Sequence, residues 1–319
     1  MDIDLAVAVA GLLVGIVVGV TGMGGGALMT PILILFFGVA PLAAVSSDLV
    51  VSLLMKPLGG FVHLRRGTVN MRLVLWLCIG SVPSAFAGVL VLRALGDGEQ
   101  VERIIRYALG VALLVASSTM VVKAYLSMRQ HAREVATGVS PTVEVEALQV
   151  RPLPTALVGV LGGFVVGMTS VGSGSLIIVA LLLLYPTLKA SQLVGTDLVQ
   201  AVPLVGAAAL GHALFGDVQL GLTGSLLIGA LPGVYLGARV SSSAPQSVVR
   251  RALVLVLLAS GAKLVGVPTA ALGVLLLVLA VVGPLAWMLA RHANGLPYLW
   301  RIERDRTPES AGTGGPASW

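Results

Sequence analysis

The chain has 319 residues, of which 57% are apolar and only 11% are charged, with a mean hydropathy of +1.00. A soluble domain of this size does not tolerate so apolar a sequence, so the composition predicts an all-α polytopic membrane protein. A single cysteine, Cys78, excludes disulfides and cysteine-based metal centres. The net charge of +6 comes from bases scattered through loops, so the expected partner is the lipid bilayer and not nucleic acid.

Eleven apolar segments can be distinguished along the sequence. The N-terminus is acidic and carries neither a basic n-region nor a cleavage signal, so the first segment is expected to be an uncleaved membrane element. Two of the eleven, 27–40 and 175–185, are shorter than the roughly 20 residues that a full span needs. In chain order the segments are 5–21, 27–40, 43–64, 72–92, 104–126, 153–169, 175–185, 191–214, 219–239, 249–266 and 269–290.

Each short segment follows a glycine-rich break, and the two breaks resemble each other. The stretch VGIVVGVTGMGGGALMTP at residues 14–31 returns as GGFVVGMTSVGSGSLIIV at residues 162–179. The pattern is typical of a helix broken inside a membrane. Non-helical backbone survives at that depth only where protein surrounds it or water lines it. The breaks are therefore predicted to form a site, with close packing of helices through small residues as the alternative.

The resemblance between the two halves continues beyond the glycine stretch. Residues 48–91 and 197–240 are identical at 13 of 44 aligned positions. Internal duplication is typical of transporter folds, so we predict two repeats, each opened by a glycine-broken helical hairpin. The predicted organisation is a first membrane repeat at 1–126, a cytoplasmic linker at 127–152, a second membrane repeat at 153–267, an extra transmembrane helix at 268–290 and a cytoplasmic tail at 291–319.

The distribution of lysine and arginine predicts the membrane topology. If each broken pair is a hairpin with both ends on one side, 15 of these residues lie on one face and 4 on the other; if each pair is a single span, they divide 11 to 8. The positive-inside rule favours the first scheme. The two repeats are then inverted, the N-terminus is outside and the C-terminus is cytoplasmic. Whether the hairpins are re-entrant or fully spanning stays open.

Inverted repeats with discontinuous helices predict a substrate site near the bilayer midplane. Helix starts offer free N–H groups and the positive end of the helix dipole, and glycine lets a ligand approach the backbone. Hydroxyl groups add donors, so two facing starts would bind a small anion. The predicted substrate-binding residues are Thr21, Gly22, Gly24, Gly25, Gly26, Thr169, Ser170, Gly172, Ser173, Gly174, Ser175 and Lys56.

Several ionisable residues lie within the apolar segments, where charge is costly and is usually functional. Asp48 and Asp197 occupy one repeat position and are predicted to couple transport or to shape the site, with helix N-capping as the alternative. Lys56 has no basic counterpart and is a candidate for attracting the substrate or for pairing with Asp48, although eight helical positions make a direct pair poor. Its alternative is snorkelling to an interface.

His63 and His212 also share a repeat position. Histidine titrates near physiological pH and could relay protons, while an interfacial histidine that fixes a helix end is the alternative. We find no spacing of histidine or carboxylate residues suited to metal binding or hydrolysis, so no metal, no cofactor and no enzymatic activity are predicted.

The doubled G-x-x-x-G-x-x-G-x-G-G motif, the GTDL run at 195–198 and the GxxPGxxLG run at 229–237 resemble the sulfite exporter family, the TauE/SafE group of anion transporters. The resemblance covers residues 5–267. It implies a plasma-membrane transporter that exports sulfite, sulfonates or related small anions by alternating access. A channel or facilitator for a small sulfur-containing or neutral solute is the alternative. Protons or another ion are candidate coupling partners, and the sequence is compatible with a homo-oligomer.

Overall fold

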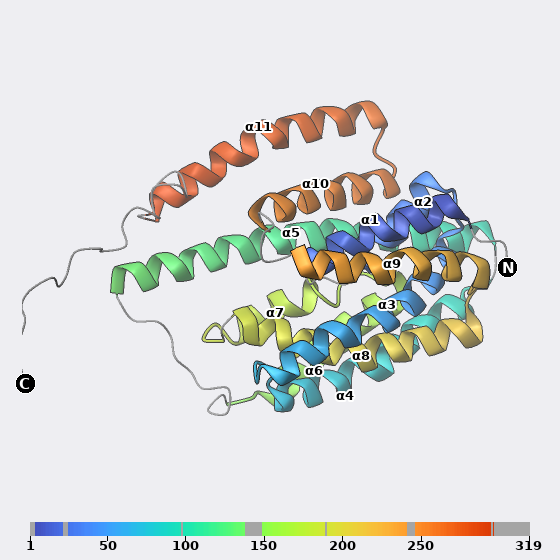
Figure 1. Ribbon diagram of the computed structural model, residues 1–319, viewed down its shortest axis with the longest axis horizontal. Helices are drawn as coiled ribbons and strands as arrows, with labels where there is room; N and C mark the ends of the chain where they lie inside the picture. The colour runs from blue at the N-terminus through green and yellow to red at the C-terminus, as the bar shows by residue number, and fades with distance from the viewer. Residues whose placement is uncertain are drawn as a thin grey trace, which may run out of the picture.

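In the computed structural model, residues 4–21, 25–96, 98–137, 149–188, 190–240, 246–294 and 296 are described, and all regular structure in them is helical. The helices lie roughly along one direction as a bundle, with α11 at its outer edge beside α10 (Figure 1). Their bounds are α1 (Leu5–Thr21), α2 (Gly26–Phe36), α3 (Pro41–Arg65), α4 (Met71–Ala94), α5 (Glu99–Thr137), α6 (Pro152–Thr169), α7 (Leu176–Leu184), α8 (Ala190–Phe215), α9 (Leu220–Val240), α10 (Gln246–Leu264) and α11 (Thr269–Ala293).

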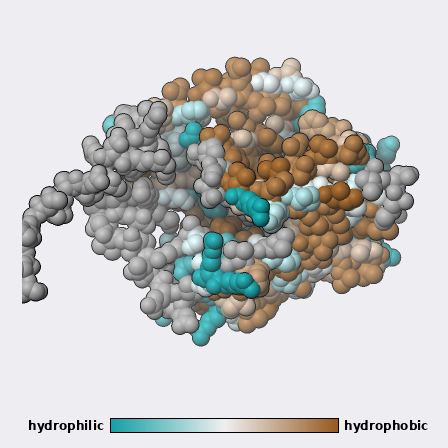
Figure 2. Space-filling view, viewed as in Figure 1, coloured by the Kyte–Doolittle hydropathy of each residue, from teal (hydrophilic) through white to brown (hydrophobic). Residues whose placement is uncertain are grey.

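The bundle is built to lie in a bilayer. Within the described ranges, seven helices are long and apolar enough to span a membrane, namely α3, α4, α5, α6, α8, α9 and α11. Large apolar side chains such as Leu13, Leu75 and Leu161 are exposed at the surface, and apolar residues cover much of the face seen in Figure 2. Because a soluble protein would bury such residues, this surface is suited to lipid. The predicted all-α polytopic membrane fold is confirmed.

All eleven predicted apolar segments are helices, and two details differ from expectation. Helix α5 continues to Thr137, into the segment predicted as a linker, because the residues SMRQHAREVAT that follow its apolar part are mostly compatible with a helix. Helix α7 spans only nine residues, so it is too short to cross a membrane by itself. The predicted cytoplasmic tail lies largely outside the described residues.

The second break shows how the sequence interrupts a helix. Helix α6 ends at Thr169, and Ser170 adopts a left-handed conformation with φ of 59°. Gly172 follows with φ of 122°, a conformation that residues with a Cβ rarely adopt, and α7 begins at Leu176. The glycine in this break is therefore required by the turn itself.

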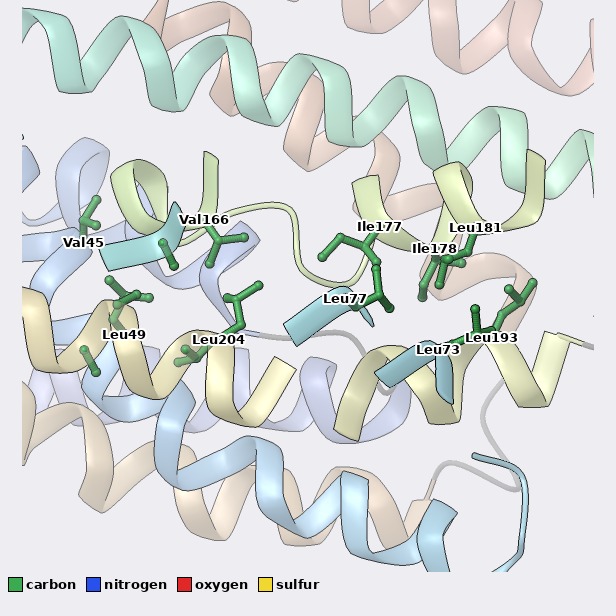
Figure 3. Packing of buried hydrophobic residues seen from close by; sticks show 14 of the residues in the cluster. Val45, Leu49, Leu73, Leu77, Val166, Ile177, Ile178, Leu181, Leu193 and Leu204 are labelled. Atoms are coloured by element: carbon green, nitrogen blue, oxygen red, sulfur yellow. The ribbon is translucent and has the colours of Figure 1, made fainter. Parts of the chain in front are cut away.

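The buried core lies between the two halves of the sequence. One cluster of buried side chains contains residues from both repeats (Figure 3). The first repeat contributes Leu49 of α3 and Leu73 and Leu77 of α4, and the second contributes Ile177 of α7 and Leu204 of α8. Helices of the first repeat therefore pack against helices of the second, and neither repeat has a core of its own in this cluster.

Two parallel helix pairs join the repeats. Helix α1 packs against α9, and α4 packs against α6. Glycines bring the backbones into contact, so that Gly11 meets Leu226, Gly15 meets Ala230 and Gly19 meets Val234. In the other pair, Gly159 meets Leu77, Gly163 meets Ser81 and Gly167 meets Ala85. These contacts occupy equivalent repeat positions, so each pair combines the first helix of one repeat with the fourth helix of the other.

Two further pairs consist of repeat equivalents that run antiparallel. Along α3 and α8, Ser46 lies next to Gly216, while Gly60 lies next to Val199 and His63 next to Gly195. Helices α5 and α10 also pack together, with Gly110 beside both Gly261 and Val265. Equivalent helices that run in opposite directions are the arrangement that inverted repeats require.

The close helix contacts give a stability prediction. A Cβ at Gly80 of α4 would collide with the carbonyl oxygen of Ala156 in α6, so Gly80→Val should force the pair apart. We expect a loss of about 1–3 kcal/mol of stability, measured by thermal unfolding in detergent. The control is Gly224→Val in α9, where a Cβ would have no atom within 4 Å. Equal melting temperatures for the two variants would contradict the packing.

Candidate functional site

Thr21 and Gly26, which flank the first glycine break, and residues of the second break line one pocket, which we call the turn pocket. Residues of α1, α2 and the second break line one part of it, and apolar residues of α5 and α10 line another. The polar and glycine lining consists of Thr21, Gly26, Lys56, Ser170, Gly172, Ser173, Gly174 and Ser175, and the apolar lining consists of Val18, Ala27, Leu28, Ala116, Met120, Leu253 and Leu257.

The breaks are in direct contact at Gly26, the first residue of α2. A Cβ at this position would collide with the carbonyl oxygen of Ser170 and would lie 2.7 Å from the Ser170 hydroxyl. Glycine is therefore required at position 26 for the two turns to approach each other. The starts of α2 and α7, which leave N–H groups without partners inside their helices, consequently border the same pocket.

Asp48 links the two repeats beneath these turns. Its side chain is fully buried, and Oδ2 accepts hydrogen bonds from Thr30 Oγ1 of α2 at 3.0 Å and from Ser170 Oγ of the second break at 2.6 Å. Asp48 lies well inside α3, which begins at Pro41, so the alternative of a helix N-cap is wrong. The carboxylate instead holds the N-terminal part of α2 against the second break.

Lys56 reaches the turn pocket from two turns farther along α3. Its side chain is only 6% exposed, and its ammonium donates a hydrogen bond to Ser173 Oγ. It interacts electrostatically with Asp197 and Asp48, while its hydrogen bond goes to the second break and not to either carboxylate. Snorkelling to an interface does not fit a lysine that is buried and points into a pocket. Among the described residues, Lys56 is the one lysine or arginine that lines the pocket.

Asp197 lies inside α8, which begins at Ala190, and is likewise no N-cap. It is 2% exposed and does not line the turn pocket. Its carboxylate interacts with two cations, Lys56 and Lys123, and Oδ1 accepts no hydrogen bond within the described part of the chain. Asp197 is thus placed to balance the charge behind Lys56.

The two histidines occupy equivalent positions but have different surroundings. His212 is fully buried, with Nδ1 at 2.8 Å from Ser46 Oγ and Nε2 at 2.8 Å from the carbonyl oxygen of Gly167. His63 is partly exposed and contacts Thr68 Oγ1 at 2.9 Å. The repeat equivalent of Ser46 is Gly195, which has no hydroxyl to offer His63. Neither histidine lines the turn pocket.

The remaining predicted site residues divide into three groups. The hydroxyls of Thr21 and Thr169 donate to the carbonyl oxygens of Val17 and Val165 in their own helices, and of the two only Thr21 lines the pocket. Gly25 faces Asp48 and not the pocket. Gly22 and Gly24 lie outside the described residues.

Sequence reasoning did not identify Thr30 as a site residue, because it lies in an apolar run without a polar counterpart in the second repeat. Thr30→Val keeps the shape of the side chain but removes a hydrogen-bond donor to the buried Asp48 carboxylate. We expect a loss of about 1.5–3 kcal/mol, seen as a lower melting temperature in detergent. The control is Ser118→Ala, which removes an exposed hydroxyl bonded to its own helix. An unchanged melting temperature for Thr30→Val would show that Asp48 does not depend on this bond.

Comparison with known proteins places this architecture in a family. The model of the family described as "Sulfite exporter TauE/SafE" matches residues 7–264, which include both breaks and every residue of the turn pocket. The chain belongs to the sulfite exporter TauE/SafE family. Helix α11 lies beyond the family match, as the resemblance in the sequence implied.

Two relatives from Bacillus subtilis (strain 168) resemble this TauE/SafE chain. "Probable membrane transporter protein YjnA" is 38% identical over 263 residues, which cover 82% of this chain and 100% of that protein. "Probable membrane transporter protein YdhB" is 22% identical over 243 residues, covering 76% of this chain and 92% of that protein. No solved structure matches the chain. The family and the relatives indicate a membrane transporter.

Proposed function

We propose that this TauE/SafE protein is a secondary transporter that exports sulfite, sulfonates or related small anions across the plasma membrane by alternating access. One observation carries the proposal: two helix breaks from different repeats meet at Gly26 and Ser170 beside the buried ammonium of Lys56. A lysine, serine hydroxyls and two helix starts are all suited to an anion.

The mechanism follows from these contacts. The anion enters the turn pocket, where Lys56 turns from Ser173 toward the substrate and both helix starts supply N–H donors. Asp48 holds α2 against the second break, so that the two starts stay in register. The antiparallel relation of α3 to α8 supports inverted repeats. The positive-inside rule favours a topology with the N-terminus outside and the C-terminus cytoplasmic. A rocking motion of the two repeats then exposes the pocket to the opposite face.

The test is an anion panel on the purified protein in detergent. A ligand that binds only the folded state raises the melting temperature by mass action. Sulfite, sulfate, thiosulfate, taurine, sulfoacetate and short carboxylates are compared, and we expect a sulfur oxyanion or a sulfonate to stabilise the protein. A well-folded protein that no anion stabilises would contradict the anion site. Counterflow in liposomes then separates a carrier from a channel, which shows no counterflow, and a dependence of the counterflow rate on pH indicates coupling to protons.

A further inference from the structure

Two rows of side chains lead away from the turn pocket toward one face of the bundle. On α5, Ala116 and Met120 line the pocket, and Lys123 follows on the same face of the helix. On α10, Leu257 and Leu253 line the pocket, and Arg250 follows on the same face. The helices are antiparallel neighbours, so both rows run in the same direction and end in a cation.

The two cations are close enough to act on each other. Lys123 is partly buried and interacts electrostatically with Arg250, which repels it, and with Asp197, which attracts it. Asp197 also interacts with Lys56 inside the pocket. Asp197 therefore interacts both with Lys123 and with the pocket lysine, Lys56. Arg250 is exposed.

A like-charge pair at the end of an apolar wall is unfavourable, and an anion bound between the two groups relieves the repulsion. With Lys56, this region carries three basic groups, whereas Asp48 and Asp197 supply two acidic ones. These charges, from α3, α5, α8 and α10, therefore sum to an excess of positive charge at this end of the turn pocket. We propose that Lys123 and Arg250 form a recruiting subsite that binds the anionic substrate at the mouth of the turn pocket before Lys56 receives it.

The subsite rests on the proposed function and indicates the direction in which the anion is transported. Lys123 and Arg250 belong to the basic face that the positive-inside rule places in the cytoplasm. Loading of the pocket from this face is what an exporter requires. Because the cations act over a distance, they raise the local concentration of the anion and increase the rate at which it associates.

The experiment measures initial rates of sulfite efflux from proteoliposomes of neutral phosphatidylcholine, with sulfite kept under nitrogen. We expect Lys123→Gln combined with Arg250→Gln to raise KM by about tenfold at low ionic strength and to leave kcat unchanged. The difference should shrink as salt is added, because the Debye length falls to about 8 Å at 0.15 M. Lys123→Arg keeps the charge and should keep the KM of the wild type.

The control is Arg251→Gln, which removes an equal charge one position along α10 from Arg250. Its KM should match that of the wild type. A double variant whose KM is unchanged overturns the subsite, and so does one that loses kcat with KM unchanged, because this pattern indicates a structural role.

An anionic lipid headgroup could bind the same two cations as the anionic substrate, so the experiment includes a comparison of lipids. The wild type is therefore compared in phosphatidylcholine and phosphatidylglycerol vesicles. If the cations serve lipid, the double variant will match the wild type in phosphatidylcholine and differ only in phosphatidylglycerol, which overturns the proposal. Wild-type protein that moves no sulfite in either lipid counts against the proposed function, whereas active wild type with an indifferent double variant counts only against the subsite.

Discussion

Gly26→Val is expected to abolish anion transport while the protein still inserts into the membrane. The new Cβ would collide with the Ser170 carbonyl oxygen, so the two breaks could no longer meet. A displacement of about 1 Å in a binding site costs on the order of a hundredfold in rate, and this collision demands at least such a shift. Sulfite efflux from proteoliposomes measures the loss, and membrane yield with size-exclusion profile measures insertion.

The neighbouring glycine provides a matched comparison. At Gly25 a Cβ would lie 3.8 Å from Asp48 Oδ1 and 3.8 Å from Ser52 Oγ, which is ordinary contact. Gly25→Ala should therefore keep the melting temperature of the wild type, whereas Gly26→Ala should lower it. Gly26→Val that transports sulfite at the wild-type rate would refute a site built from two touching turns.

Lys56→Gln is expected to remove most of the affinity for the anion. The substitution keeps a polar side chain of moderate length but removes the only cation that lines the turn pocket among the residues described. Hydrogen bonds to charged groups contribute about 1.5–3 kcal/mol, so KM for sulfite should rise by about 10- to 150-fold. The sulfite-induced rise in melting temperature should disappear with it.

Lys263→Gln is the control for this prediction. Lys263 also donates a hydrogen bond to a hydroxyl, Thr269 Oγ1 at 2.7 Å, but it does so at an exposed position away from the turn pocket. Its removal should change neither KM nor the response to sulfite. A Lys56→Gln protein that binds sulfite as tightly as the wild type would remove the lysine from the proposed site.

Most of the fold could be predicted from the sequence, because each helix and each break depends on a pattern of neighbouring residues. Long apolar runs specify helices, and the Gly and Ser clusters specify the breaks between α1 and α2 and between α6 and α7. The extension of α5 to Thr137 was missed because hydropathy reports contact with lipid, whereas helix formation also suits the polar residues beyond it.

Contacts within the candidate site could be predicted only in part. The duplication suggested that two turns face each other, but Asp48 binds Ser170 across 122 positions and Lys56 binds Ser173 across 117. Sequence periodicity carries no information about such distant partners. The repeat also suggests equal roles for His63 and His212. Because the repeat equivalent of Ser46 is a glycine, His212 contacts the Ser46 hydroxyl whereas His63 contacts that of Thr68.

The glycine-mediated pairing of α1 with α9 and of α4 with α6 determines which parts of the chain can move as rigid bodies. Backbones in direct contact cannot slide or separate without losing that packing, so each pair behaves as one lever. Each pair combines one helix of the first repeat with one helix of the second. A fragment that contains one repeat would therefore hold only one helix of each pair. Co-expressed halves must form the contacts of α1 with α9 and of α4 with α6 before either pair is complete.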